Sequence, residues 1–201
     1  MLRKIRSLVL NSNPSYVEVY DNSLSSKECE ILVNEFFKSE ISEGVIAASD
    51  GQVKVNSKLK KCKQIHDSYF EDQSLISRTI LPILSDNIDK YKKKYSSLDY
   101  LYSWNIVDTY SFQKYEGEGE GYLSWHCEHG PPPISNRLLA WMFYLNDAKS
   151  GTEFMNYPPV NAKIGRCVIW PAGWTHLHRS QLPNKGLKYI ITGWVGYRPA
   201  N

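Results

Sequence analysis

A histidine and a glutamate two residues apart are the residues of this sequence best suited to bind a metal. His126 and Glu128 lie at the end of the segment 115–128, beside a predicted strand. Successive side chains of an extended strand point to opposite faces, so we expect these two to share one face, with Cys127 on the other. An imidazole and a carboxylate that point into one cavity suit a divalent metal. In isolation, a His-x-Glu pair is more often a surface ion pair.

A catalytic metal site of this kind needs a third protein ligand, and the segment 174–178 offers two candidates. His176 and His178 are also two residues apart, so in an extended segment they too would share a face. Strand periodicity therefore does not choose between them. The four cysteines are far apart and include no Cys-x-x-Cys pair, which argues against a zinc ribbon.

Lys188 is a further candidate because it lies in a predicted strand that has no clear solvent face. Alternation places Lys188 on one face with Trp194, and an inward ammonium needs an anion nearby, since burying an unpaired charge is costly. Alternatively, Lys188 lies at the edge of the strand and extends to water. Tyr144, on the predicted strand 138–145, could donate a hydrogen bond to the same anion or could be a core residue.

The elements that must position these residues change in character along the chain. Residues 16–20 alternate like a short strand, and Ser25-Ser26-Lys27-Glu28 is a capping box that predicts the start of a helix. Residues 44–55 could form a hairpin. A second helix is predicted from about residue 74 to about 95, and Pro82 should kink or divide it.

From residue 101 onward the apolar periodicity changes from about four to two, which is typical of strands. We predict strands at residues 104–115, 138–145, 167–170 and 188–195. Helices followed by a run of strands indicate an α+β fold with the helices packed on one sheet of an antiparallel sandwich or barrel. We expect a single domain over residues 1–201, with helical support at about 16–96 and a catalytic core at about 100–198.

Charge and hydropathy argue against two classes of partner. The net charge is only +3, and the lysine cluster (Lys58, Lys60, Lys61 and Lys63) has few interleaved aromatic residues. We therefore expect these lysines to be solvated and no nucleic acid to bind. The sequence holds neither a signal-peptide core nor an apolar run of membrane-spanning length, which favours a soluble cytoplasmic protein with no membrane partner.

Six features, in this order, give the chain a resemblance to iron(II)- and 2-oxoglutarate-dependent oxygenases of the prolyl 4-hydroxylase type. The resemblance covers roughly residues 16–194 and is strongest from Tyr110 onward. The features are a tyrosine before a glycine-rich loop (Tyr115), a His-x-acid pair (His126, Glu128), Tyr-Leu-Asn (144–146), Gly-Thr-Glu-Phe (151–154), a distal histidine (His178), and Lys-Tyr before a closing tryptophan (Lys188, Tyr189, Trp194). This family has a double-stranded β-helix, or jelly-roll, core.

The resemblance implies that His126, Glu128 and His178 bind iron(II). It selects His178 because the spacing from His178 to Lys188 is that of the family, and it leaves His176 as the fallback. Glu128 departs from the family pattern, which usually has aspartate, so its reach differs by one methylene.

The resemblance also implies a set of residues that bind the cosubstrate 2-oxoglutarate. Lys188 would meet its distal carboxylate, and Tyr144 would hydrogen-bond the same group. Tyr115 would lie near the iron-bound end, and Trp194 would pack against the pocket.

The implied activity is a dioxygenase that consumes O2 and 2-oxoglutarate, releases succinate and CO2, and hydroxylates an exposed proline of a peptide or protein at C4. Several relatives depend on ascorbate, and the sequence leaves that dependence open. Trp125, Trp141 and Trp174 either line an aromatic groove for such a substrate or belong to the core. The alternative function is a non-oxygenase jelly-roll domain that binds zinc or another ligand.

Overall fold

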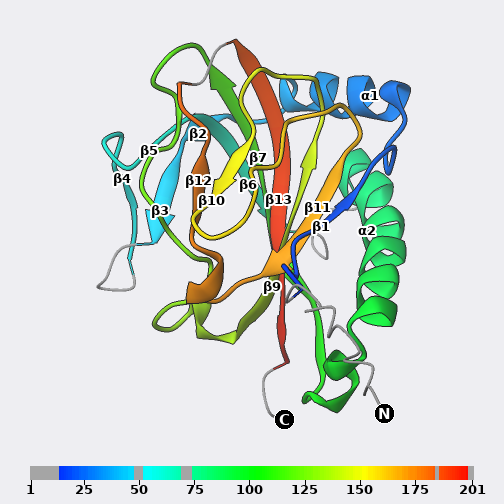
Figure 1. Cartoon of the computed structure of the whole chain (residues 1–201). Coiled ribbons are helices and arrows are strands. Elements are labelled where there is room, and N and C mark those ends of the chain that lie inside the picture. Colours follow the sequence, from blue (N-terminus) through cyan, green and yellow to red (C-terminus); the bar gives the residue numbers. More distant parts are fainter. Residues whose placement is uncertain (1–13, 48–51, 69–73, 184–185, 199–201) are drawn as a thin grey trace, which may run out of the picture.

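A seven-stranded antiparallel sheet forms the centre of the molecule (Figure 1). The computed structural model describes residues 14–47, 52–68, 74–183 and 186–198. The strands follow the order β1-β11-β9-β13-β7-β6-β2. Their bounds are β1 Glu18–Tyr20, β2 Ser42–Glu43, β6 Lys63–Ser68, β7 Trp104–Glu116, β9 Arg137–Tyr144, β11 Cys167–Pro171 and β13 Leu187–Tyr197.

Short strand pairs form a second layer. They are β5 (Lys60–Lys61) with β8 (Gly121–Tyr122), and β10 (Thr152–Phe154) with β12 (His178–Ser180). From β7 to β13 the chain alternates between the large sheet and these short strands, which is the path of a jelly roll. The predicted α+β fold with a jelly-roll core is confirmed.

A hairpin lies beside this second layer. Its strands, β3 (Val45–Ala47) and β4 (Val53–Val55), pair antiparallel as predicted for residues 44–55. Residues 48–51, which connect them, lie outside the described residues.

Two α-helices cover one face of the large sheet (Figure 1). In the predicted capping box, Ser25 closes α1 (Ser26–Phe36) by accepting from the Glu28 amide, while the Glu28 carboxylate accepts from the Ser25 amide. The second helix, α2, spans Leu75–Lys94. Three short 3-10 turns complete the described elements: η1 Ser96–Tyr100, η2 Ile134–Asn136 and η3 Trp174–His176.

Pro82 does not divide α2, which runs through it as one helix of 20 residues. Proline removes one intrahelical hydrogen bond. On both sides of Pro82, however, Ile76, Ile80, Leu84 and Ile88 are buried against the sheet. This packing stabilises the helix on both sides of Pro82, so tertiary contacts outweigh the local cost of the proline.

The two faces of the large sheet carry different sets of side chains. Phe112, Trp141 and Ile191 pack with the helices in one buried cluster. Tyr144 and Trp194 belong to a separate cluster on the other face. Strand alternation thus separates the structural core from the side chains that could form a site.

No helix within the described part of the chain is long and apolar enough to cross a membrane.

Gly193 allows the core to close behind the site. A Cβ atom added at this position would lie 2.4 Å from the Cζ2 atom of Trp141 and 3.2 Å from the Thr109 carbonyl oxygen. Trp141 is fully buried, so it has little room to yield. Any side chain at Gly193 would therefore strain the centre of the sheet.

We expect Gly193→Ala to lower the free energy of unfolding by about 1–3 kcal/mol, because it overpacks the core. The matched control is Gly173→Ala, where an added Cβ would meet no heavy atom within 4 Å. Urea denaturation followed by circular dichroism measures both. Equal stability of the two variants would show that Trp141 can shift freely.

Candidate active site

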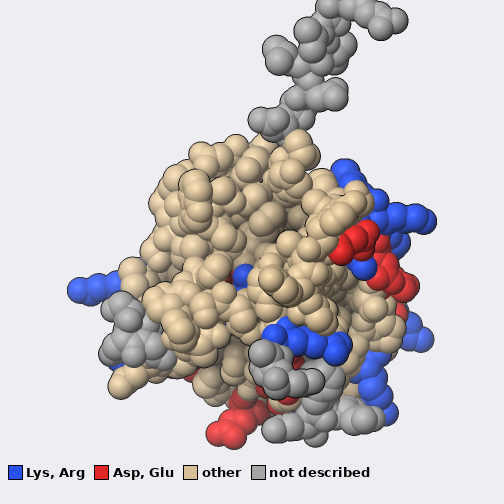
Figure 2. All heavy atoms as spheres, turned by 90° about the horizontal axis from the view of Figure 1, so that it is seen from below, with Lys and Arg blue, Asp and Glu red and all other residues tan. Residues whose placement is uncertain are grey.

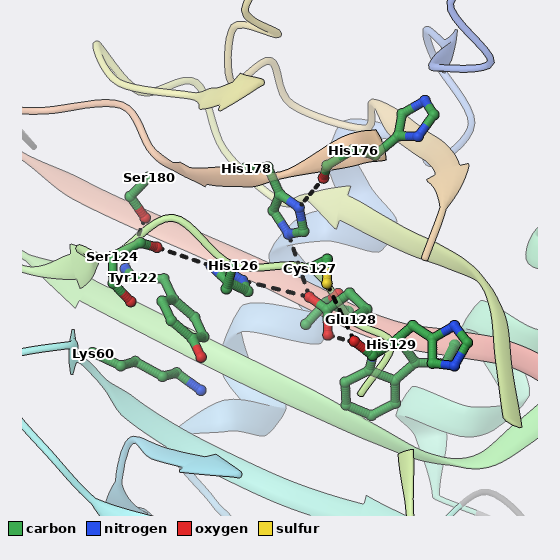
Figure 3. Close-up of polar contacts among 12 residues, drawn as sticks. Lys60, Tyr122, Ser124, His126, Cys127, Glu128, His129, His176, His178 and Ser180 are labelled. Atoms are coloured by element: carbon green, nitrogen blue, oxygen red, sulfur yellow. Dashed lines mark hydrogen bonds and ion pairs between the residues drawn. The ribbon is translucent and has the colours of Figure 1, made fainter. Parts of the chain in front are cut away.

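Two imidazole nitrogens and a carboxylate oxygen converge on one point between the two layers (Figure 3). Glu128 Oε1 lies 3.6 Å from His126 Nε2 and 3.3 Å from His178 Nε2. All three ligand atoms lie within 4.8 Å of one another. A mixed set of two nitrogens and one oxygen, without cysteine, suits a divalent first-row metal such as iron(II).

Backbone carbonyls fix the orientation of both rings. His126 Nδ1 lies 3.0 Å from the Ser124 carbonyl oxygen, and His178 Nδ1 lies 2.9 Å from the His176 carbonyl oxygen. A carbonyl only accepts, so each Nδ1 carries the proton and donates it. In the neutral ring this leaves the Nε2 lone pair directed at Glu128, which is the arrangement that second-shell carbonyls give to metal-binding histidines.

The charges at this point require a cation. Burial, together with the nearby His178, lowers the pKa of His126 and keeps its ring neutral. Burial raises the pKa of the Glu128 carboxyl, but a proton on Nε2 of His126 or His178 would hydrogen-bond to the carboxylate, and this interaction lowers the pKa well below its usual range. Three electron-pair donors that face one another repel unless a proton or a metal lies between them. The residues present therefore fit a metal ion.

The local backbone differs from the predicted extended strand. His126 forms only an isolated antiparallel bridge with His178, and Glu128 lies outside any regular strand. Their backbone hydrogen bonds go to other segments: the amide of His126 donates to the His178 carbonyl, and the amide of Glu128 donates to the Ala172 carbonyl. Tertiary pairing rather than alternation thus brings the two side chains together.

His176 and His178 do not share a face, contrary to the expectation for an extended segment. The turn η3 ends at His176, so strand alternation does not apply across the pair. The His176 ring points away from Glu128 (Figure 3), and its Nε2 lies 2.8 Å from the Ser15 carbonyl oxygen. The structure therefore brings His178, and not His176, to the other two ligands.

The second oxygen of Glu128 is held by two groups. Trp194 Nε1 donates to Oε2 at 2.8 Å, and Arg137 Nη1 donates to the same oxygen at 3.3 Å. The Arg137 guanidinium lies 3.4 Å from the centre of the Trp194 ring. Oε1 is thereby left facing the two histidines. Trp194 was predicted at the pocket from the sequence. Arg137 was not, because the only feature that marks it in the sequence is its charge at the start of an apolar strand.

A cavity of about 600 Å³ opens beside these ligands. Its lining includes five of the seven predicted site residues: His126, Glu128, His178, Tyr115 and Trp194. Figure 2 shows the molecule from below Figure 1; this face is mostly uncharged and hollowed near its centre, with charged side chains gathered at its rim.

Lys188 and Tyr144 lie one layer behind the lining. Tyr144 is fully buried, and its hydroxyl lies 2.7 Å from Thr152 Oγ1. Lys188 is only 2% exposed, so it points inward. Its Nζ donates to the Gly151 carbonyl at 3.4 Å and lies 5.0 Å from the centre of the Tyr115 ring. Tyr115 and Thr152 thus separate Lys188 and Tyr144 from the cavity.

Lys188 has no carboxylate within 4.0 Å among the described side chains. Burial lowers its pKa to about 8. An ammonium in this position is costly unless an anion binds to it. Lys188 is therefore suited to an anionic group that enters from the cavity.

Lys60 was predicted to be solvated, and this prediction is wrong. We expected the cluster of four lysines to be solvated, yet Lys60 is only 5% exposed and lines the cavity. Its neighbours Lys61 and Lys63 are exposed, as expected. The strand β5 is two residues long, too short for a periodic pattern that could have revealed the difference.

Comparison with protein families identifies this part of the chain. Residues 110–196 match the 2OG-Fe(II) oxygenase superfamily. This segment runs through β7–β13 and contains the three converging ligands. No curated protein sequence matches the chain significantly.

Prolyl hydroxylases are among the solved structures with a similar fold. The viral collagen prolyl hydroxylase of Paramecium Bursaria Chlorella virus-1, in complex with 2OG, is 19% identical with a TM-score of 0.64 (91% of this chain and 97% of that chain covered). The Pseudomonas putida prolyl-4-hydroxylase is 14% identical with a TM-score of 0.64 (92% and 94%). The Trichoplax adhaerens prolyl hydroxylase, bound to a hypoxia inducible factor peptide fragment, is 16% identical with a TM-score of 0.67 (92% and 84%).

At these identities the structural likeness shows the fold alone, and the match over residues 110–196 shows that this segment is similar to 2OG-Fe(II) oxygenases. The oxygenase reading is thus favoured over a metal- or ligand-binding jelly roll without oxygenase activity. The match over residues 110–196 relates this segment to the 2OG-Fe(II) oxygenase superfamily, whose members use iron(II), 2-oxoglutarate and O2.

Proposed function

We propose that this protein is a prolyl 4-hydroxylase-like dioxygenase, which converts a peptidyl proline, 2-oxoglutarate and O2 into 4-hydroxyproline, succinate and CO2. The observation that carries the proposal is the convergence of His126, Glu128 and His178 beside a large cavity with a buried lysine behind it. One oxygen atom of O2 enters succinate and the other enters the C–H bond, so the reaction balances.

In this proposal His126, Glu128 and His178 hold iron(II), which supplies the oxidising chemistry when it is bound together with 2-oxoglutarate. The protein positions the ligand atoms that hold the metal. Ser124 and His176 carbonyls keep both imidazole rings oriented. Trp194 and Arg137 occupy one oxygen of Glu128, so that the other remains available to the metal.

Lys188 would bind the distal carboxylate of 2-oxoglutarate, with Tyr144 as a second hydrogen-bond donor. The support is its inward position and the absence of an anionic partner among the described residues. Access to Lys188 requires the Tyr115 side chain to shift, since its ring lines the cavity and lies 5.0 Å from Lys188 Nζ.

Part of the cavity lining has the apolar character that a proline-containing segment would need, and an aromatic ring lies next to it. Pro133 and Ile134, from the loop after Glu128, line it. Arg179 also lines it, and its guanidinium lies 4.5 Å from the centre of the Trp125 ring. Such a surface can hold an extended polyproline segment.

Only part of the predicted aromatic groove remains available for that role. Trp125 and Trp174 are 37% and 79% exposed. Trp141 is fully buried in the helix-side core, so it does not line a groove. The substrate proposal therefore relies on Trp125 and the loop residues around the cavity.

We expect His178→Ala to abolish stoichiometric iron(II) binding, because it removes one of three ligands. His176→Ala should retain most of the affinity, since that ring bonds to Ser15 and points away from Glu128. Equilibrium dialysis under argon, corrected for the folded fraction, measures both. The opposite ranking of the two variants would overturn the assignment of the distal ligand.

We expect Lys188→Ala to weaken 2-oxoglutarate binding by roughly ten- to a hundredfold, the worth of a charge-assisted hydrogen bond, and to leave iron affinity nearly unchanged. In the wild type, affinity should fall as the pH rises through about 8, where free Lys188 loses its proton. Calorimetric titration across pH measures this. Affinity that is unaltered by Lys188→Ala would place the carboxylate elsewhere.

We expect incubation with iron(II), 2-oxoglutarate and proline-containing peptides to add one oxygen atom to proline. Fragmentation mass spectrometry locates the added mass, and comparison with 4-hydroxyproline standards identifies the carbon. Succinate formed with a free amino acid or nucleoside, but with no prolyl peptide, would contradict the substrate proposal and leave the oxygenase class intact.

A further inference from the structure

The cavity is lined by a second buried lysine, Lys60, to which the proposed reaction assigns no role. Lys60, on β5, is 5% exposed and lines the cavity directly, whereas Lys188 lies behind the lining. Figure 3 shows the Lys60 side chain extending toward the ring of Tyr122. Burial lowers the pKa of Lys60, and the charges of Cys62 and Glu128 raise it by less.

The partners of Lys60 are neutral. Its Nζ donates to Gln64 Oε1 at 2.9 Å and to the Val45 carbonyl oxygen at 3.2 Å. An ammonium has three N–H donors, so one remains without a hydrogen bond to the described residues. None of the described carboxylates lies within 4.0 Å of this ammonium. Two hydrogen bonds hold the group in place, and no carboxylate in the described part of the chain forms an ion pair with it.

The position of Lys60 relates it to the metal ligands. The Tyr122 ring stacks on the His126 ring with 3.4 Å between their centroids. Lys60 Nζ lies 5.9 Å from the centre of the same Tyr122 ring, on β8, which pairs with β5. A small molecule or a short side chain can therefore contact Lys60 and also reach the point on which the three metal ligands converge.

The charge of the lining favours an anionic ligand. Among its described residues, three carry a positive charge, namely Lys60, Arg137 and Arg179, and only Glu128 is acidic. Arg137 already contacts Glu128 and Arg179 pairs with Glu153, so Lys60 is the lining cation that has no carboxylate partner among the described residues. The remaining side chains near Lys60 are neutral hydrogen-bonding groups that could support a carboxylate: Gln64, His66, Ser111 and Gln113.

We propose that the substrate carries a carboxylate and that Lys60 binds it, placing the C–H bond that reacts next to the metal ligands. The proposal rests on the oxygenase class proposed above and concerns the substrate of that site; a free imino acid as the source of the carboxylate would replace the peptidyl proline. The carboxylate could belong to an acidic residue beside the proline of a peptide or to a free imino acid. Lys60 would then act as a specificity-determining residue, while Lys188 serves the cosubstrate.

Two pairs of probes test the carboxylate requirement, because the members of each pair differ only in charge. The first pair is the capped peptides Gly-Glu-Pro-Gly and Gly-Gln-Pro-Gly; the second is L-proline and L-prolinamide. Calorimetry under argon, with iron(II) and 2-oxoglutarate bound, gives their affinities. In one pair the carboxylate member should bind roughly ten- to a hundredfold more tightly than its neutral partner. The pair that responds identifies the source of the carboxylate.

Three variants test whether Lys60 causes the preference for the carboxylate member of the pair. Lys60→Met should bring the affinity ratio of that pair close to one, and Lys60→Arg should keep most of it. The matched control is Lys61→Met, at the exposed neighbour, which should leave the ratio unchanged. Equal binding, or no binding, of both members in both pairs by the wild type overturns the proposal, as does a preference that survives Lys60→Met.

A separate measurement distinguishes this proposal from the proposed function. Lys60→Met should leave the affinity for 2-oxoglutarate within about twofold of the wild type, whereas Lys188→Ala should lower it. A loss caused by Lys60→Met instead would assign Lys60 to the cosubstrate and overturn the inference. If the wild type forms no succinate with any probe, the oxygenase proposal fails, while the paired affinities still test the role of Lys60.

Discussion

The pairing of β13 with both β7 and β9 is the constraint on which the site depends. Its register sets Lys188 opposite Tyr115 and Ile190 opposite Tyr144. The same alternation sends Tyr189 and Ile191 into the helix-side core. A slip by one residue would exchange the two sets, exposing the core and removing the buried ammonium from the site. Packing of the helices thus fixes the chemistry on the other face.

The metal ligands lie where regular structure ends, and the surrounding hydrogen bonds replace it. Backbone pairing with His178 and Ala172 holds the segment that carries His126 and Glu128. The Ser124 carbonyl orients the His126 ring through its Nδ1 atom. The Trp194 indole and the Arg137 guanidinium orient the Glu128 carboxylate. Because Glu128 replaces the aspartate usual in the family, its longer side chain has more freedom, and the bonds from Trp194 and Arg137 restrict it. Protein contacts alone thus hold the three ligand atoms in their converging arrangement.

The sequence predicted the features that depend on local pattern, and it failed where tertiary contacts decide. Strand alternation placed Lys188 on one face with Trp194, which the structure shows to be buried, and the capping box located the start of α1. The course of α2 through Pro82 depends on packing that no local pattern reveals. Lys60 is buried although its neighbours in the same basic run are solvated, because the hairpin of β3 and β4 and the side chain of Gln64 enclose it.

A crystal structure grown under argon with iron(II) and 2-oxoglutarate, with anomalous scattering recorded at the iron edge, tests the central claim most directly. We expect one anomalous peak, coordinated by His126 Nε2, Glu128 Oε1 and His178 Nε2. We also expect the distal carboxylate of 2-oxoglutarate to bind to Lys188. Iron bound by other residues, or that carboxylate bound at Lys60 with Lys188 still enclosed, would contradict it.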